Sequence, residues 1–131
     1  MHKILYVEDE TIIAEVYKRM LEHAGFNVEV ASDGYRALEL VSVFEPELIL
    51  LDLMLPGIDG VEILKTIRSN EKTKSLPVFI FSNAMSRELV QQAWDAGATK
   101  CFTKADWTPK ELISAIKAHF KDIDNSQQLT Q

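Results

Sequence analysis

Cysteine is nearly absent from this sequence, which has one, Cys101, among 131 residues. A single cysteine excludes an intramolecular disulfide and is typical of a reducing compartment. Long hydrophobic runs are also missing, since no apolar run approaches the roughly 20 residues that span a bilayer. The first residues, Met-His-Lys-Ile-Leu, pass directly into a strand-like pattern, which predicts no signal peptide. We therefore expect a cytoplasmic protein.

Positive charge is scarce too, with 14 Lys and Arg against 20 Asp and Glu and a net charge of −6. A chain with this balance is not attracted as a whole to nucleic acid or to anionic membranes, so we expect neither as a direct partner. The three histidines are scattered, match no metal-ligand spacing, and are predicted to lie at the surface. Repeats and interdomain linkers are absent, and the length suits one domain with one core.

What the sequence does contain is a regular alternation of strand-like and helix-like segments. The predicted strands cover residues 3–7, 26–31, 48–51, 77–82 and 100–103. Each gap between them holds a helical pattern, and a fifth helix follows the last strand. Because parallel strands need such crossovers, this order predicts an α/β fold with a doubly wound parallel sheet and helices on both faces.

Local signals set the expected ends of these helices. Asp59 and Ser86 are predicted N-caps, and the stretch from Thr108 to Glu111 has the residues of a capping box. After Lys121 the chain becomes polar and is expected to fray. We therefore predict a domain over residues 1–121 and a polar C-terminal tail over 122–131. The apolar face of the first helix is predicted from the 3.6-residue period to consist of Ile12, Ile13, Val16, Met20 and Leu21.

The most apolar stretch, Leu48-Ile49-Leu50-Leu51, ends at Asp52. Pro46 precedes it and Pro56-Gly57 follows it, so it is predicted to be a strand buried on both faces. In an open parallel sheet, ligands bind at the carboxyl ends of the strands. Since Asp59 already caps the next helix, Asp52 is not needed for that purpose. We predict that Asp52 is the reactive residue.

Polar side chains lie at the carboxyl ends of four of the five predicted strands: Glu8 and Asp9, then Asp52, Ser82 and Lys104. In a parallel sheet these strand ends meet, so the side chains are expected to share one pocket. Clustered carboxylates repel one another, and Mg²⁺, which prefers oxygen ligands and joins one or two carboxylates to a phosphate, relieves that repulsion. Because a carboxylate can also attack phosphorus to form an aspartyl-phosphate, the set predicts Mg²⁺-dependent phosphoryl transfer.

From Lys3 to about Lys121, the sequence resembles the receiver domain of two-component response regulators. The matching segments are Glu8-Asp9, Asp52 with Pro56-Gly57 and Asp59-Gly60, Ser82-Asn83-Ala84, and Phe102-Thr103-Lys104. The resemblance implies a flavodoxin-like sheet of five strands in the order 2-1-3-4-5. It also implies a phosphoprotein that works as a switch in phosphorelay signal transduction.

The resemblance further implies that Asp52 is the phosphoacceptor, with a sensor histidine kinase or a histidine phosphotransfer domain as donor. It implies that Glu8, Asp9, Asp52 and the backbone carbonyl of Met54 place Mg²⁺. A domain of this kind is not an enzyme acting on other substrates, because it catalyses only its own phosphorylation and dephosphorylation.

Two further residues are implied to complete the site, because Ser82 and Lys104 would each bind a phosphoryl oxygen. Ser82 and Phe102 would form the switch, with Phe102 turning inward as Ser82 closes on the phosphoryl group. The change would reach a downstream protein effector through the face of the fourth helix, fifth strand and fifth helix. The family commonly forms homodimers through the same face.

The sequence departs from the family pattern at Glu8, at Ala105 and at Phe102, an aromatic switch residue that has no hydroxyl to donate. Glu8 is one methylene longer than the commoner Asp and is expected to hold metal through water. Lys104 is followed by Ala105 where the family often has Pro, which leaves the isomer of that peptide bond open. Met54 and Ala84 match positions that control the hydrolytic water, and neither can orient it by hydrogen bonding. We therefore predict a long-lived phosphoryl group.

Two alternatives belong to other functional classes. An aspartyl-phosphate phosphohydrolase of the haloacid-dehalogenase type needs a second acid two residues after the nucleophile, where this chain has Met54. A flavodoxin-like flavin carrier needs a phosphate-binding loop after the first strand, where Glu8-Asp9-Glu10 would repel the phosphate. Both alternatives therefore fit the residues less well than the signalling switch.

Overall fold

A computed structural model describes residues 1–83 and 85–129, with side-chain surroundings up to Ser126. Five parallel strands form one sheet in the order β2-β1-β3-β4-β5. Their bounds are β1 (Lys3–Val7), β2 (Asn27–Ala31), β3 (Leu48–Leu51), β4 (Val78–Ser82) and β5 (Lys100–Thr103). The predicted fold class and strand order are therefore confirmed.

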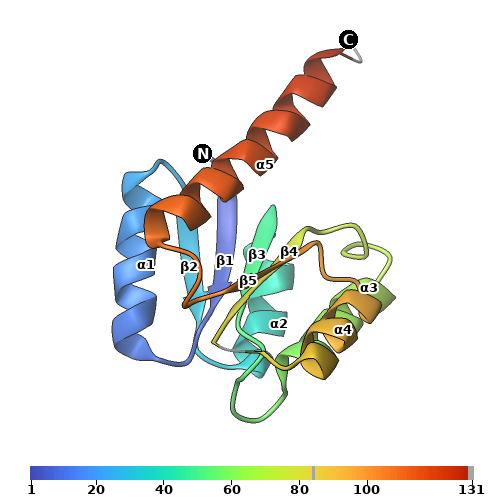
Figure 1. Cartoon of the computed structure of the whole chain (residues 1–131). Helices are drawn as coiled ribbons and strands as arrows, with labels where there is room; N and C mark the ends of the chain where they lie inside the picture. Colours follow the sequence, from blue (N-terminus) through green and yellow to red (C-terminus); the bar gives the residue numbers. More distant parts are fainter. Residues whose placement is uncertain (84, 130–131) are drawn as a thin grey trace.

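The helices lie in two layers, one on each face of this sheet (Figure 1). Their bounds are α1 (Thr11–His23), α2 (Gly34–Val43), α3 (Gly60–Ser69), α4 (Arg87–Asp95) and α5 (Pro109–Leu129). Helices α1 and α5 cover one face, and α2, α3 and α4 cover the other. All four residues of β3 are fully buried, because successive side chains enter opposite core layers. The prediction of a central strand buried on both faces is confirmed.

The predicted helix caps are also confirmed. The side chains of Asp59 and Ser86 each accept a hydrogen bond from the backbone N–H three residues further on, at 3.0 and 3.1 Å. Thr108 and Glu111 exchange the two bonds of a capping box, at 2.9 and 3.1 Å. These caps satisfy backbone donors that a helix leaves unpaired at its first turn, so they define where α3, α4 and α5 begin.

The predicted inner face of α1 is wrong at two positions. Ile12 is 81% exposed and Val16 is 48% exposed. The residues that face the sheet are Ala14, Tyr17 and Leu21, which lie three and four positions apart and so share one side of the helix. The apolar residues of α1 spread over more than one side, so periodicity alone selected a face rotated away from the sheet.

The prediction of a frayed segment after Lys121 is also wrong, because α5 continues to Leu129. Figure 1 shows this helix projecting beyond the sheet. The boundary that we predicted between domain and tail at residue 121 falls inside a continuous helix, and the division into two parts stays a prediction. No helix among the described residues is both long and apolar enough to cross a bilayer.

Candidate functional site

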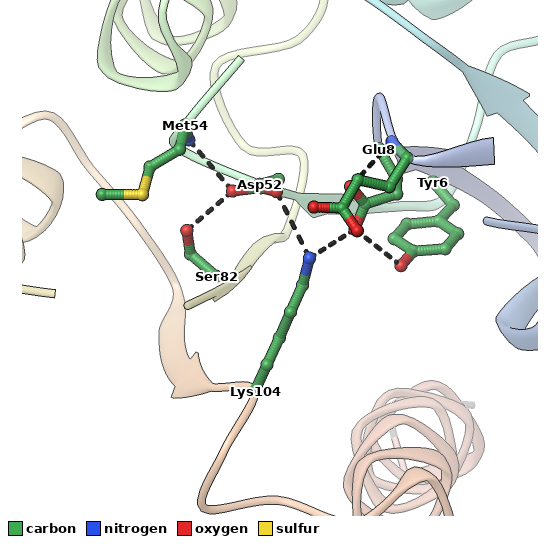
Figure 2. Close-up of polar contacts among 7 residues, drawn as sticks. Tyr6, Glu8, Asp52, Met54, Ser82 and Lys104 are labelled. Carbon is green, nitrogen blue, oxygen red and sulfur yellow. Dashed lines mark hydrogen bonds and ion pairs between the residues drawn. The ribbon is translucent and has the colours of Figure 1, made fainter. Parts of the chain in front are cut away.

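Asp52 follows β3 at the carboxyl end of the sheet, where all five strands finish. Its backbone N–H donates to the Val7 carbonyl at 3.1 Å, which places it beside the end of β1. Carboxylate oxygen Oδ1 accepts hydrogen bonds from Ser82 Oγ at 2.6 Å and from the Met54 N–H at 2.9 Å. The other oxygen, Oδ2, lies 3.3 Å from Lys104 Nζ (Figure 2). The carboxylate is only 4% exposed and is held through both oxygens.

Glu8 is more deeply buried than Asp52, at 1% exposure. Its Oε1 accepts hydrogen bonds from the Tyr6 hydroxyl at 3.2 Å and from Lys104 Nζ, and its Oε2 accepts one from the Glu10 N–H at 3.2 Å. A buried carboxylate is tolerated only when it is paired and hydrogen-bonded in this way. In this structure Glu8 is therefore the counter-ion of Lys104.

Lys104 lies between the two buried carboxylates and belongs to the segment after β5. Its backbone N–H donates to the Ser82 carbonyl at 2.7 Å, which continues the pairing of β5 with β4. Burial alone would lower the pKa of the Lys104 ammonium. The hydrogen bond to Glu8 and the negative charges of Asp52 and Glu8 outweigh burial, so the pKa is raised. One permanent cation therefore serves two carboxylates.

A metal ion fits the remaining negative charge. Glu8, Asp9 and Asp52 each offer one carboxylate oxygen, and these three atoms lie within 4.8 Å of one another. An all-oxygen set of this kind suits a hard divalent cation such as Mg²⁺. Asp9 is the exposed member of the set, whereas the other two are buried and already bonded to Lys104. Asp9 is thus the most available ligand.

Gly60 holds the segment after Asp52 close to α3. A Cβ atom added at Gly60 would lie 2.5 Å from the Leu53 Cα and 2.8 Å from the Asp52 carbonyl oxygen. No larger residue fits without moving that backbone. The Gly60 N–H also donates to the Leu53 carbonyl at 3.1 Å. In the sequence, Gly60 is visible only as part of the receiver motif, and its place after the N-cap Asp59 is the one signal for this packing role.

Tyr6 is a second residue at the site that no motif in the sequence indicates. It lies in an apolar strand, and its hydroxyl donates to Glu8 at 3.2 Å. The available signal was a hydroxyl-bearing residue two positions before the first acid, since side chains two apart in a strand lie on the same face.

The two predicted switch residues are both buried. Ser82 is fully buried and already bonds Asp52 at 2.6 Å. Phe102 is 5% exposed, with ring centroids 5.6 Å from Phe79 and 4.6 Å from Trp107. Our hypothesis that the Phe102 ring turns inward on phosphorylation requires the ring to be outside beforehand, whereas in this structure the ring is already buried.

The structure describes the peptide bond after Lys104 and one of the two residues matched to water-controlling positions. The Lys104–Ala105 peptide is trans, because the described backbone has no cis bond. Ala84, which we matched to a water-controlling position, lies outside the described residues. Met54 is described, and its side chain is 54% exposed beside the site.

Comparison with known proteins agrees with this geometry. The family profile of the response regulator receiver domain matches residues 4–117. The DNA-binding dual master transcriptional regulator RpaA of Synechocystis sp. is 31% identical over 128 residues, which cover 98% of this chain and 53% of RpaA. The DNA-binding response regulator MtrA of Mycobacterium tuberculosis is 31% identical over 123 residues, which cover 94% of this chain and 52% of MtrA. The chain thus spans about half the length of these two relatives.

Solved structures with the same fold include two CheY-like proteins. Chemotaxis protein CheY4 of Vibrio cholerae has a TM-score of 0.83 and 29% identity, covering 90% of this chain and 98% of that one. A CheY-like receiver domain protein from Methanospirillum hungatei has a TM-score of 0.87 and 25% identity, covering 96% and 98%. By profile, by sequence and by fold, the chain belongs to the response regulator receiver domain family.

Proposed function

We propose that this chain is a phosphorylation-dependent signalling switch whose phosphoacceptor is Asp52. The observation that carries the proposal is the environment of the Asp52 carboxylate. It is 4% exposed at a strand end, and hydroxyl, ammonium and backbone N–H donors lie within 3.3 Å of its oxygens. Membership of the receiver family supports the same role. The phosphoryl donor is a phosphohistidine on a sensor histidine kinase or on a histidine phosphotransfer domain.

In the transfer of the phosphoryl group, Asp52 is the one residue of the protein that forms a covalent bond. A carboxylate oxygen of Asp52 bonds to phosphorus as the phosphorus–nitrogen bond breaks, and the departing imidazole keeps the electron pair. Positioning and charge neutralisation then decide the rate. The Ser82 hydroxyl and Lys104 ammonium now bond Asp52. They need to move only a short way to reach phosphoryl oxygens, which supports their assignment as the oxygen-binding groups.

Magnesium is the metal that we propose for the acidic cluster. Glu8, Asp9, Asp52 and the backbone carbonyl of Met54 would hold it, and when bound it would neutralise negative charge on the phosphoryl oxygens. The close approach of the three carboxylate oxygens supports this assignment. Because Glu8 is bonded to Lys104, we expect it to contact the ion through water, as its length suggested.

A phosphohydrolase that acts on other substrates is the less suitable alternative. Such an enzyme needs an acid two residues after the nucleophile, and that position holds the half-exposed Met54. A methionine cannot exchange protons with a leaving group. We therefore propose that the chain catalyses only its own phosphorylation and dephosphorylation.

The output surface that we propose is formed by α4, β5 and α5. Phe102 lies on β5 and contacts Trp107 just before α5, so a shift at Ser82 can reach that surface through these rings. A downstream protein effector or a second copy of the chain would bind there. The two relatives named above are described as DNA-binding, but the net charge of −6 disfavours nucleic-acid contact by this segment itself. The single Cys101 supports a cytoplasmic location.

The test of the central proposal is phosphorylation by acetyl phosphate with Mg²⁺, followed by intact-mass measurement. The parent should gain one phosphoryl group and Asp52→Asn should gain none. Asp59→Asn is the matched control, because it makes the same change nearby and asparagine also caps helices well. It should be labelled like the parent. Equal labelling of Asp52→Asn and the parent would end the proposal.

A further inference from the structure

Tyr6 presents a hydroxyl inside the most buried part of the molecule. The residue is fully buried in β1, and among the described residues its hydroxyl donates to Glu8 Oε1, at 3.2 Å. Figure 2 shows the ring beneath Glu8, on the side away from Asp52. Because a carboxylate oxygen can only accept, the phenol hydroxyl is the donor in this contact.

The position of Tyr6 explains how the longer acid is accommodated. Tyr6 lies in β1 on the face covered by α1 and α5, and Glu8 follows just beyond the end of that strand, within reach of the Tyr6 hydroxyl. The Glu8 side chain folds back toward that face, where the Tyr6 hydroxyl and Lys104 Nζ meet the same oxygen, Oε1. The other oxygen, Oε2, accepts only the Glu10 N–H among the described contacts.

The two oxygens of the Glu8 carboxylate therefore have different partners. Oε1 accepts from two donors and Oε2 from one, so Oε2 keeps more acceptor capacity for a metal ion or its bound water. Without the Tyr6 bond, Oε1 would be held by Lys104 alone, and the Glu10 N–H would still hold Oε2. Lys104, moreover, is the group that must turn toward the phosphoryl oxygens during transfer.

We propose that Tyr6 is a positioning residue that holds Glu8 ready for the metal ion while Lys104 changes partner. The inference rests on the proposed Mg²⁺ site and adds to it a hydroxyl that fixes one of its ligands. Groups that orient metal ligands change metal affinity by about 10- to 100-fold when they are removed. Because Glu8 is expected to bind through water, an effect of about 10-fold is expected here.

A buried tyrosine also fills space, so the test must separate its hydroxyl from its ring. Tyr6→Phe removes the hydroxyl and keeps the ring, which lies edge-on to Tyr17 with centroids 6.1 Å apart. Tyr17→Phe is the matched control, because it removes a phenol from the same ring cluster and no bond from its hydroxyl to Glu8 is found among the described residues. Urea unfolding of each variant shows whether the fold is kept.

The measurement is Mg²⁺ affinity by titration calorimetry, with Mg²⁺ alone as the probe. Tyr6→Phe should weaken binding about 10-fold and Tyr17→Phe should leave it unchanged. Acetyl phosphate labelling by Tyr6→Phe should be slow at limiting Mg²⁺ and reach the parent's rate at saturating Mg²⁺. Such a split locates the defect in metal binding, since a general loss of packing would lower the rate at both concentrations.

A double-mutant cycle with Glu8→Asp completes the design. The shorter side chain withdraws the carboxylate beyond hydrogen-bond reach of the Tyr6 hydroxyl, so Tyr6→Phe should have no further effect on Mg²⁺ affinity in that background. An equal loss in both backgrounds, or unchanged affinity of Tyr6→Phe alone, overturns the role of Tyr6 and leaves the metal site standing. Failure of the parent itself to bind Mg²⁺ overturns both.

Discussion

The two ends of the sheet each carry a cluster of charged side chains, and the clusters differ in burial. At the carboxyl end, the side chains of Glu8, Asp52 and Lys104 are 0%, 6% and 11% exposed. At the amino end, His2 bonds Glu47 at 2.8 Å and Asp124 at 3.3 Å, with exposures of 32%, 44% and 52%. Charges in the interior interact strongly and are little screened by salt, whereas exposed pairs contribute roughly 0–1 kcal/mol.

The clusters also differ in charge balance. At the carboxyl end, Glu8, Asp9 and Asp52 carry three negative charges against one positive charge on Lys104, which leaves two unbalanced. Such a deficit attracts a divalent cation, and that property suits a site for chemistry.

At the amino end, Glu47 and Asp124 face His2, and the Lys3 N–H donates to Glu47 at 3.0 Å while its ammonium donates to the Phe44 carbonyl. When the His2 ring is protonated, the two carboxylates face its charge and that of the nearby Lys3, so the amino end has no charge deficit like that of the carboxyl end. This cluster joins β1, the segment before β3 and the extended part of α5, which is a structural task.

Replacing Lys104 should cause the largest loss in the free energy of unfolding, and therefore the largest contrast between the clusters at the two ends of the sheet. Lys104→Met keeps most of the aliphatic stem but leaves Glu8 and Asp52 buried without their cation. Removing one partner of a buried pair costs about 3 kcal/mol at the lower end of the usual range, which suits a lysine at the rim. Urea unfolding should show this loss at both low and high salt.

Mg²⁺ should recover part of the stability of Lys104→Met, because a bound cation supplies the missing positive charge only to the folded state. Lys72→Met is the control, since Lys72 is exposed and makes no ion pair among the described residues, and its stability should match the parent's. A loss below about 1 kcal/mol for Lys104→Met would mean that the carboxyl end behaves like an exposed cluster.

Met54 tests whether the rim of the carboxyl end controls water. Hydrolysis of the phosphoryl group needs a water in line with the bond from Asp52 to phosphorus. The Met54 N–H bonds Asp52, so its half-exposed side chain begins right beside that approach. Met54→Asn can orient a water and should speed dephosphorylation about fivefold, equal to roughly 1 kcal/mol of barrier.

The rate is measured by loss of the phosphoryl mass with time after acetyl phosphate is removed. Met54→Leu should behave like the parent, because it stays apolar with a similar volume. His2→Phe, at the other end of the sheet, should also leave the rate unchanged. Acceleration by Met54→Leu equal to that of Met54→Asn would show that coverage, rather than hydrogen bonding, sets the rate.

Sequence patterns located the carboxyl-end cluster because each of its residues lies at or just after the end of a strand. Asp52, Ser82 and Lys104 needed only the strand positions and the parallel order to be brought together. To predict the hydrogen bond from Tyr6 to Glu8, one must also know the direction in which the buried glutamate side chain folds. That direction depends on which donors surround it, which strand periodicity does not encode.

The amino-end cluster could not be predicted in the same way. His2 and Asp124 lie at opposite ends of the chain, and their contact depends on α5 continuing past Lys121. His119 was predicted at the surface, but it is half-buried with its ring 5.3 Å from those of Phe79 and Phe120. A lone histidine in a helix has no pattern that separates these outcomes, because packing of α5 decides them.

The smallest expected effect is the pH dependence of the His2 cluster. Both ring nitrogens of His2 face carboxylates, an arrangement that only the protonated ring satisfies with two donors. The hydrogen bond to Glu47 is the main cause that raises the pKa of His2, against the opposing effect of burial, with Asp124 adding to the increase. The resulting stability is fully present below the unfolded pKa of about 6.5 and disappears as pH rises through the higher folded pKa.

The variant that isolates this effect is His2→Phe. The His2 ring stacks on Phe120 with centroids 4.1 Å apart and an angle of 8°, and phenylalanine can keep that stacking while losing both polar contacts. The free energy of unfolding of the parent minus that of His2→Phe should therefore be larger at pH 5.5 than at pH 8.5, by about 0.5–1 kcal/mol for exposed pairs. High salt should reduce the difference.

Other titrating groups face the same ring and set the useful pH range. Burial opposes the charge of Glu47, but the bond to His2 and further contacts lower its pKa, so its contribution is lost as pH falls below the ordinary value and through the lowered folded pKa. Burial, followed by Lys100, lowers the pKa of His119, whose titration occurs in both proteins and largely cancels in the difference. A difference that does not change with pH would show that His2 acts at the amino end through stacking alone. The amino-end cluster would then not be a charged structural contact that can be compared with the charged cluster at the carboxyl end.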